Sequence, residues 1–245
     1  MFKSKIVTFV ILLLGLIIIP TLASAQSSFS VNLGADLYNR YVWRGMDIAN
    51  TPSLQPSLSV SCHGMELGTW GAYTLSNEAS DSDEIDFWLS YTRTIGTSLT
   101  ATLIATDYYY PNGGVKIGNF NNYDDPDGAG AHTIEIGLSI TGPENFPITG
   151  SGYINVHNDE GSNVYFQIDY PVTIGEYTLN FTVGGTPGSE DTPDYYGTDN
   201  LQIINIGVSS SKDLKVSDDF ILPATAAFIL NPQKEVAYLL FGLSF

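Results

Sequence analysis

The sequence predicts an all-β fold, a transmembrane antiparallel up-and-down β-barrel of about 12 strands. Apolar and polar residues alternate with a period of two in stretches of about 9 to 13 residues, the length that a tilted strand needs to cross a bilayer. After residue 25 no apolar run has the length of a membrane helix, so a chain that enters a bilayer must do so as a closed barrel. The chain also ends in an alternating apolar segment whose last residue is a phenylalanine.

Residues 1–25 have the pattern of a secretory signal peptide and precede the expected barrel, residues 26–245. Lys3 and Lys5 make the start positive, residues 6–19 are almost wholly apolar, and the following small residues form a cleavage pattern. The alternative is a membrane helix, but the run of 14 residues before Pro20 is shorter than the about 20 residues that a spanning helix needs. We therefore expect export and a place in the bacterial outer membrane.

Composition narrows the class of the mature chain. Without Lys3 and Lys5 the formal charge is −17 − 2 = −19, and such a surface repels nucleic acid, so we expect no nucleic-acid partner. The single cysteine, Cys62, cannot form an internal disulfide, so packing and hydrogen bonds must hold the fold together. The roughly 220 mature residues contain no linker and indicate one all-β domain.

Residues 29 to 44 show the clearest alternation and predict the first strand. The polar face of this strand carries Asp36, Arg40 and Arg44. The apolar face consists of Phe29, Val31, Leu33, Ala35, Leu37, Tyr41 and Trp43, and only Asn39 interrupts it. A soluble β-sandwich with its apolar face turned inward shows the same pattern, so alternation alone leaves both folds open.

Further alternating stretches bring the total to an even number of strands, as expected when both ends of a bacterial barrel lie on the periplasmic side. The two longest connections, near residues 112–130 and 186–199, both fall on the outer side of this arrangement, where such barrels have their long loops. Pro56 and Pro223 lie inside predicted strands and are expected to mark bulges or strand ends.

The last ten residues alternate apolar and other side chains up to the terminal Phe245. This segment resembles the terminal signal that the barrel-insertion machinery of outer membranes recognises. The residues expected to form the signal are Tyr238, Phe241, Leu243 and Phe245. The alternative is an ordinary final strand that happens to end in phenylalanine.

Several segments of the N-terminal half resemble the TorF-type putative porins, a family of small exported barrels. They are residues 41–45, Tyr-Val-Trp-Arg-Gly, residues 84–87, Glu-Ile-Asp-Phe, and residues 108–111, Tyr-Tyr-Tyr-Pro. The resemblance implies a barrel and, by the family's name, a pore, and it supplies no catalytic residues. The acidic third outer loop departs from the family pattern, so no loop function is carried over.

Charged residues on the polar faces are candidates for the lumen and its constriction. They are Asp36, Arg40, Arg44, Glu84, Asp86 and Glu135. In a porin, opposed charges at a constriction set ion preference and orient permeating solutes. The alternative is an internal salt-bridge network that plugs a narrow barrel. Aromatic residues near strand ends, Tyr41 and Trp43 among them, are expected to form interfacial girdles.

We predict no catalytic site, no metal site and no cofactor. The histidines His63, His132 and His157 have no neighbouring serine motif of the kind that a hydrolase of the outer membrane would need. The acidic segments 124–128 and 190–194 lack the spacing of a calcium-binding loop and are typical of solvated loops.

The expected function is passive diffusion of small solutes with a weak preference for cations, because the mature chain is strongly acidic and has only three arginines. The expected partners are outer-membrane lipids, the barrel-insertion machinery and the small solutes themselves. The alternatives are a non-conducting structural or surface-recognition barrel and, third, an outer-membrane hydrolase.

Overall fold

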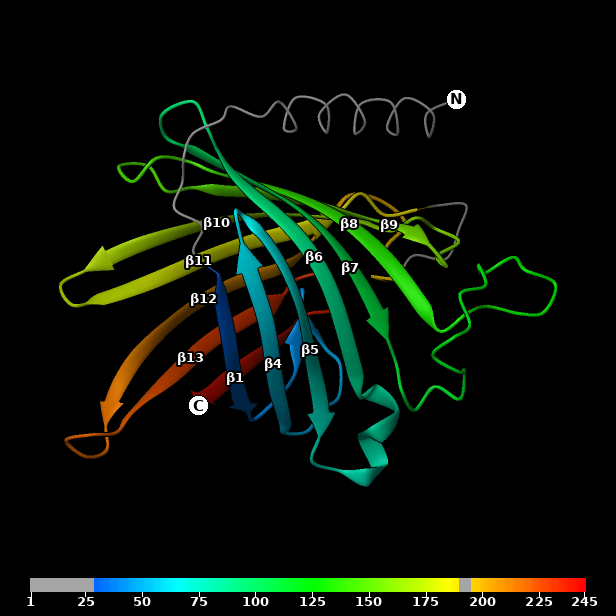
Figure 1. Cartoon of the computed structure of the whole chain (residues 1–245), viewed down its shortest axis with the longest axis horizontal. Helices are drawn as coiled ribbons and strands as arrows, with labels where there is room; N and C mark the ends of the chain where they lie inside the picture. Colours follow the sequence, from blue (N-terminus) through cyan, green and yellow to red (C-terminus); the bar gives the residue numbers. More distant parts are fainter. Residues whose placement is uncertain (1–28, 190–194) are drawn as a thin grey trace.

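The computed structural model describes residues 29–189 and 195–245, which form one closed antiparallel barrel (Figure 1). The bounds of its twelve strands are β1 (Ser30–Tyr38), β4 (Ser53–Cys62), β5 (Met65–Thr74), β6 (Glu84–Ile95), β7 (Leu99–Tyr109), β8 (His132–Thr141), β9 (Thr149–His157), β10 (Val164–Ile174), β11 (Tyr177–Thr186), β12 (Gln202–Lys215), β13 (Ile221–Asn231) and β14 (Val236–Ser244). Each strand pairs with its neighbours along the chain, and β1 closes the ring against β14. The predicted fold class and strand number are confirmed, while the predicted signal peptide, residues 1–25, lies outside the described residues.

The two faces of the barrel wall differ in chemistry. Many outward side chains are large and apolar, for example Leu33, which is 82% exposed, and Phe241, which is 57% exposed. The inward face carries polar side chains that are buried, such as Ser59, Glu84 and Asn205. Rows of exposed apolar residues are typical of a lipid-facing surface, so the fold is compatible with an outer-membrane protein.

No helix within the described residues has both the length and the apolar character that crossing a membrane requires.

The connections differ between the two ends of the barrel. Residues 110–131, between β7 and β8, and the described residues between β11 and β12, 187–189 and 195–201, lie at the same end, as the sequence predicted, and we call this the loop end. The opposite end, which we call the turn end, has tight turns such as residues 63–64 and 175–176. A short 3-10 helix, η1 (Asn77–Ser82), lies in the connection before β6.

Pro56 and Pro223 lie within strands and do not mark strand ends. The ladder between β4 and β5 has no paired residue at Pro56, which pairs only with Ala35 of β1. Pro223 pairs with Asp213 of β12, whereas the pairing of β13 with β14 begins one residue later, at Ala224. Each proline therefore occupies a position where one of the two ladders lacks a pair, which a residue without an N–H group tolerates.

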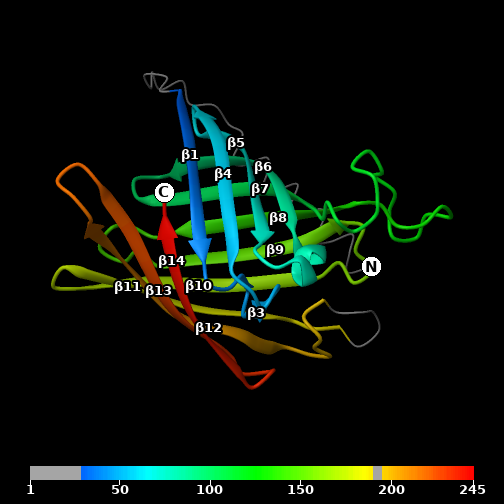
Figure 2. The same cartoon turned by 90° about the horizontal axis from the view of Figure 1, so that it is seen from below.

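The seam between β1 and β14 is the shortest ladder of the ring, and Figure 2 shows these two strands side by side. Only the segment 36–38 pairs with the segment 242–244. On one side of these pairs Ala35 and Phe245 exchange two backbone hydrogen bonds of 3.2 and 2.9 Å. On the other side the backbone of Asn39 donates to Phe241 O at 3.0 Å, and the backbone N–H of Phe241 donates to Asn39 Oδ1 at 2.8 Å. The terminal residue is thus part of the closure of the ring.

Deleting Phe245 is expected to lower the folded fraction of the barrel, because two of the few hydrogen bonds across the seam disappear. We expect a loss of about 1–3 kcal/mol in the free energy of unfolding. The measurement is heat-modifiable migration and urea unfolding of the purified barrel in detergent. The control is Phe245→Ala, which keeps both backbone hydrogen bonds and removes only the ring. A deletion variant as stable as the alanine variant would show that these hydrogen bonds do not stabilise the seam.

Candidate functional site

A short hairpin follows β1 and leaves the barrel wall. After Tyr38 the chain forms a separate two-stranded sheet of β2 (Val42–Trp43) and β3 (Met46–Asp47). The turn between them is made by Arg44 and Gly45, whose φ angles are 48° and 78°. Two successive residues with positive φ are typical of the tight turn that joins antiparallel strands. We call residues 40–48 the hairpin.

The prediction of one continuous strand over residues 29–44 was wrong. The alternation of the sequence continues through the hairpin, because β2 and β3 are themselves strands with a period of two. The physical break is at Asn39, the residue that interrupts the apolar face, whose side chain bonds β14 at the end of the seam. Tyr41 and Trp43, expected in a lipid-facing girdle, belong to the hairpin instead of to β1.

The hairpin packs inside the barrel. Tyr41 and Met46 are buried, and Met46 contacts a cluster that includes Tyr165 of β10 and Ile204 of β12. The Asn231 side chain of β13, which is fully buried, donates a hydrogen bond of 3.1 Å to the carbonyl oxygen of Gly45. The tip of the hairpin is therefore fixed to the wall on the β10 to β13 side.

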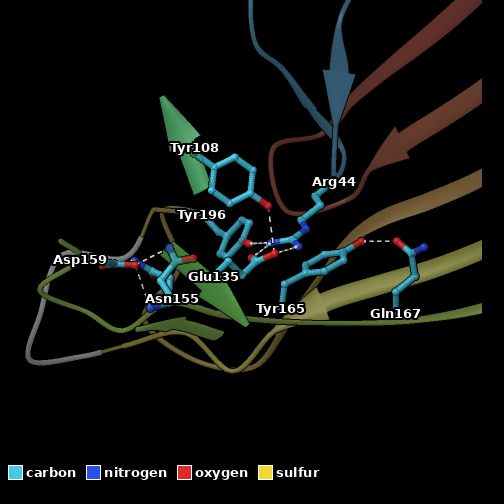
Figure 3. A network of polar contacts seen from close by, with 9 residues as sticks. Arg44, Tyr108, Glu135, Asn155, Asp159, Tyr165, Gln167 and Tyr196 are labelled. Atoms are coloured by element: carbon cyan, nitrogen blue, oxygen red, sulfur yellow. Dashed lines mark hydrogen bonds and ion pairs between the residues drawn. The ribbon is translucent and has the colours of Figure 1, made fainter. Parts of the chain in front are cut away.

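An ion pair fixes the hairpin to another part of the wall. Arg44 donates two parallel hydrogen bonds, of 2.7 and 2.8 Å, to the carboxylate of Glu135 on β8 (Figure 3). The side chains are only 9% and 4% exposed, respectively. Arg44 also donates to the Tyr196 hydroxyl at 2.8 Å, and the Tyr108 hydroxyl donates to Glu135 at 2.9 Å. A buried charge pair with this bidentate geometry is specific, because removing either partner leaves the other uncompensated.

Aromatic rings surround the guanidinium group of Arg44. Its central carbon lies 4.2 Å from the ring centre of Trp43 and 4.5 Å from those of Tyr153 and Tyr165. These distances allow cation–π attraction in addition to the ion pair. Burial is the largest single influence and lowers the pKa of Arg44, but the hydrogen bond to Glu135 and the electrostatic interactions with Tyr196, Glu135 and Tyr108 together raise the net pKa. The guanidinium group therefore stays charged in its buried position.

The base of the hairpin contacts a third part of the wall, at β6. The Tyr41 hydroxyl donates to Glu84 at 2.9 Å, and the Tyr110 hydroxyl donates to the other carboxylate oxygen of Glu84 at 3.2 Å. Asp86 is the next inward residue of β6 after Glu84. Its Oδ1 atom is buried and has no hydrogen-bond partner among the described residues. The ring of Trp70 packs against Tyr41 with 5.4 Å between the ring centres.

The other two predicted lumen residues do not join these networks. Arg40 pairs with Asp47 across the hairpin, and its side chain is about a third exposed. Asp36 lies on the inward face of β1 beside Tyr38, whose pairing with Gly242 is part of the seam. The structure thus brings Arg44 to Glu135 and Glu84 to Asp86, while Asp36 and Arg40 remain apart from both pairs.

The residues of the predicted insertion signal lie on two faces of β14. Phe241 and Phe245 are exposed on the outward face, and Leu243 shares that face by alternation. Tyr238 has the opposite parity and pairs with Ile229, and Arg40 lies 5.9 Å from its ring centre. Tyr238 therefore faces inward.

The three histidines occupy structural positions. His132 lies between the rings of Tyr109 and Phe120, and its two ring nitrogens contact Asp107 at 2.9 Å and Ile117 O at 2.6 Å. His63 is in a turn, where its Nδ1 lies 2.9 Å from the sulfur of Cys62, and His157 ends β9. Within residues 29–189 and 195–245, no group of three acidic, histidine or cysteine side chains is placed to hold a metal ion. The acidic segment 190–194 lies outside the described residues.

The hairpin divides the lumen into separate cavities. Tyr41 and Trp43 line a cavity of about 160 Å³ together with the loop-end residues Asn163 and Tyr195. They also line a cavity of about 540 Å³ that reaches Trp88 and Gln167, further from the loop end along β6 and β10. A third cavity, of about 340 Å³, lies between the hairpin and β11 to β14. The same two side chains thus form the partition between the loop-end cavity and the largest cavity.

Sequence reasoning missed the residues that hold the hairpin from the wall, namely Tyr108, Tyr165, Tyr196 and Asn231. The tyrosines looked like members of an interfacial girdle, because they lie near strand ends. Two signals in the sequence indicated the hairpin that these residues hold. Asn39 broke the apolar face, and the Arg-Gly pair at residues 44–45 is a combination that suits a tight turn with positive φ.

Comparisons with known proteins give one family match and one partial relative. A family model described as a bacterial protein of unknown function (Gcw_chp) matches residues 22–229. A holo-(acyl-carrier-protein) synthase of Cupriavidus necator is 37% identical over 78 residues, which cover 31% of this chain and 54% of that protein. The chain thus spans about half the length of that relative. Neither match supports the resemblance to TorF-type porins.

Proposed function

The chain belongs to the Gcw_chp family of bacterial proteins of unknown function, and we propose that it is an outer-membrane barrel through which small solutes diffuse only when the hairpin leaves the lumen. The observation that carries this proposal is the position of the hairpin, which contacts the wall at β6, β8 and β13. These strands are distributed around the ring, so the hairpin crosses the lumen from one side to the other.

The outer surface supports a place in a membrane. Leu67, Leu89, Ile168 and Leu239 are all large, apolar and about half exposed on the outside of the wall. Charged residues gather on the inward face, where Glu84 and Glu135 are nearly fully buried. A water-soluble β-sandwich would have the reverse arrangement, with its apolar rows packed against each other. Outer-membrane lipids are therefore the surroundings that this surface fits.

The contacts of the hairpin support a closed resting state. A hydrophobic partition alone could be displaced at low cost, but the buried pair of Arg44 and Glu135 has to be broken or rehydrated before the hairpin moves. The hydrogen bonds of Gly45 with Asn231 and of Tyr41 with Glu84 have to open as well. We propose that the barrel is closed most of the time and conducts in rare openings.

The charge of the lumen supports a preference for cations during those openings. Arg44 is neutralised by Glu135, and the remaining buried charged residues at the hairpin, Glu84 and Asp86, are acidic. A constriction with an excess of carboxylates favours cations over anions.

Conductance of the purified barrel in a planar bilayer tests the proposal. The hairpin can be shortened without breaking the barrel, because the backbone of Ile48 donates to Tyr41 O at 2.9 Å and the two ends are adjacent. We expect the wild-type protein to be mostly silent, and a variant with two glycines in place of residues 42–47 to give frequent, cation-preferring steps.

Two outcomes would contradict the proposal. Equal, steady conductance of both proteins would show that the hairpin does not close the lumen. Silence of both would exclude the diffusion path and favour a structural or surface-recognition barrel.

A further inference from the structure

The largest of the three cavities described above is lined by all three tryptophans of the chain. Trp43, Trp70 and Trp88 surround a space of about 540 Å³ between the hairpin and the inner face of β5 to β10. This volume is within the range of about 300–1,000 Å³ that is usual for small-molecule sites. Tyrosines complete the aromatic wall, and the charged groups that line it are Arg44, Asp86 and Glu135.

Asp86 is the polar group in this cavity whose hydrogen bonding is incomplete. Its cross-strand partner is Trp70 of β5, and Trp88 is the next inward residue of its own strand. Asp86 lines the cavity, and its Oδ1 atom is buried and lacks a hydrogen-bond partner among the described residues. An acceptor of this kind is costly unless a ligand or an ordered water completes its hydrogen bonds.

The charges around Asp86 are not balanced by the protein. The carboxylate of Asp86 forms no ion pair among the described residues, and its neighbour Glu84 is itself an acid whose oxygens accept from Tyr41 and Tyr110. Arg44 cannot compensate this charge, because both its strong hydrogen bonds go to Glu135. A cation that enters the cavity would meet the carboxylate of Asp86.

The rings of Trp70 and Trp88 make no described cation–π contact, and Trp70 packs against Tyr41. Arg44 uses Trp43, Tyr153 and Tyr165 for its cation–π contacts, and the described cation–π contacts do not involve Trp70 or Trp88. Trp88 is held in place by a hydrogen bond of 3.0 Å from its Nε1 to Glu66, and its ring lies over Gly68, which has no side chain to displace it. The two rings and the carboxyl group thus line one cavity, in which Trp88 is fixed by its hydrogen bond to Glu66.

We propose that this cavity binds a small organic cation of the alkylammonium class, held by the carboxylate of Asp86 and by the rings of Trp70 and Trp88. The aromatic wall favours an organic cation over a hard metal ion, which would need several oxygen ligands instead of rings. The proposal rests on the proposed function in that it names the class of solute the barrel takes. The site itself is complete in the closed barrel, so binding does not require the hairpin to move.

Choline and its uncharged carbon isostere test the proposal on the wild-type barrel in detergent. Because all three tryptophans line the cavity, their fluorescence reports occupation directly. We expect choline to shift the tryptophan emission in a saturable way and the isostere to do so at least about tenfold more weakly, since only the charge differs. Equal responses to the two ligands, or no saturable response to choline, would overturn the proposal without any variant.

Asp86→Asn then identifies the charge responsible, with Asp36→Asn as the matched control. Both substitutions remove one carboxylate from the inward face of the wall, but only Asp86 lines the cavity. We expect choline affinity to fall about tenfold or more in Asp86→Asn and to change little in Asp36→Asn, with heat-modifiable migration confirming that both fold. An equal loss in both variants would mean that the barrel attracts choline only by its overall charge, and would also overturn the proposal.

The binding and conductance experiments can fail independently. Choline binding to a barrel that stays silent even without residues 42–47 would leave this site standing and contradict the diffusion path. Frequent conductance of the shortened barrel without selective choline binding to the wild type would support the diffusion path and contradict the binding site.

Discussion

Replacing Glu135 by glutamine is expected to be among the most destabilising single substitutions of a charged residue in this protein. The change keeps the size of the side chain and an oxygen that accepts from Tyr108, but it removes the counter-charge of Arg44, which is 9% exposed. Losing one partner of a buried ion pair costs about 3–5 kcal/mol. We expect most of this loss to appear as release of the hairpin, measured as faster hydrogen exchange of the amides of residues 41–47, and the remainder as a lower urea midpoint.

The double variant Arg44→Met with Glu135→Gln is the control for the charge. With neither charge present, no ion remains buried without a partner, so we expect the double variant to be more stable than Glu135→Gln alone. An effect of Glu135→Gln below about 1 kcal/mol would show that water reaches Arg44 and that the ion pair does not fix the hairpin.

The second large effect is expected for Gly45→Ala, which should prevent the hairpin from docking. A β-carbon at Gly45 would lie 2.0 Å from the carbonyl oxygen of Ile204, and backbone on both sides leaves no flexible side chain to yield. The positive φ of 78° adds strain for any residue other than glycine. We expect the barrel to form with the hairpin undocked, so that trypsin cuts after Arg40 or Arg44 and conductance steps become frequent.

The control variant Gly114→Ala separates the effect of backbone strain from the effect of the steric clash. Gly114 has a φ of 76°, close to that of Gly45, but nothing lies within 4 Å of its β-carbon position. The Gly114→Ala protein should therefore lose little stability, and its hairpin should still resist trypsin. A Gly45→Ala protein with the same resistance as Gly114→Ala would mean that the hairpin tip tolerates a shift away from β12.

The barrel could be predicted from sequence because each strand repeats the same local signal. Alternation places Leu33 outside and Asp36 inside whatever the partner strand is, so the wall follows from neighbours along the chain. The same alternation made the hairpin look like part of the first strand. Tyr41 and Trp43 continue the alternation of β1, although the chain has already left the wall and turned inward. The break at Asn39 and the Arg-Gly pair at residues 44–45 distinguished the two courses.

The sequence predicted which charged residues face the lumen, but not which of them contact each other. Arg44 and Glu135 were both expected in the lumen, but they are 91 positions apart and no local pattern connects them. Their pairing depends on where the hairpin crosses the ring, which is a property of the closed barrel. The tyrosines that complete the network could not be told from interfacial tyrosines, because both kinds lie near strand ends.

The position of Asn39 links the closing of the ring to the enclosure of the hairpin. Asn39 bonds Phe241, which is 202 positions away, and the next residue begins the hairpin. Contacts between such distant segments form late in folding, because the loop between them must first be ordered. When β14 reaches β1, Asn39 is fixed at the end of the seam, so the hairpin that follows it starts from a defined point on the rim of the closed ring. The few residues that join the two ends of the chain thus also set the point from which the hairpin enters the lumen.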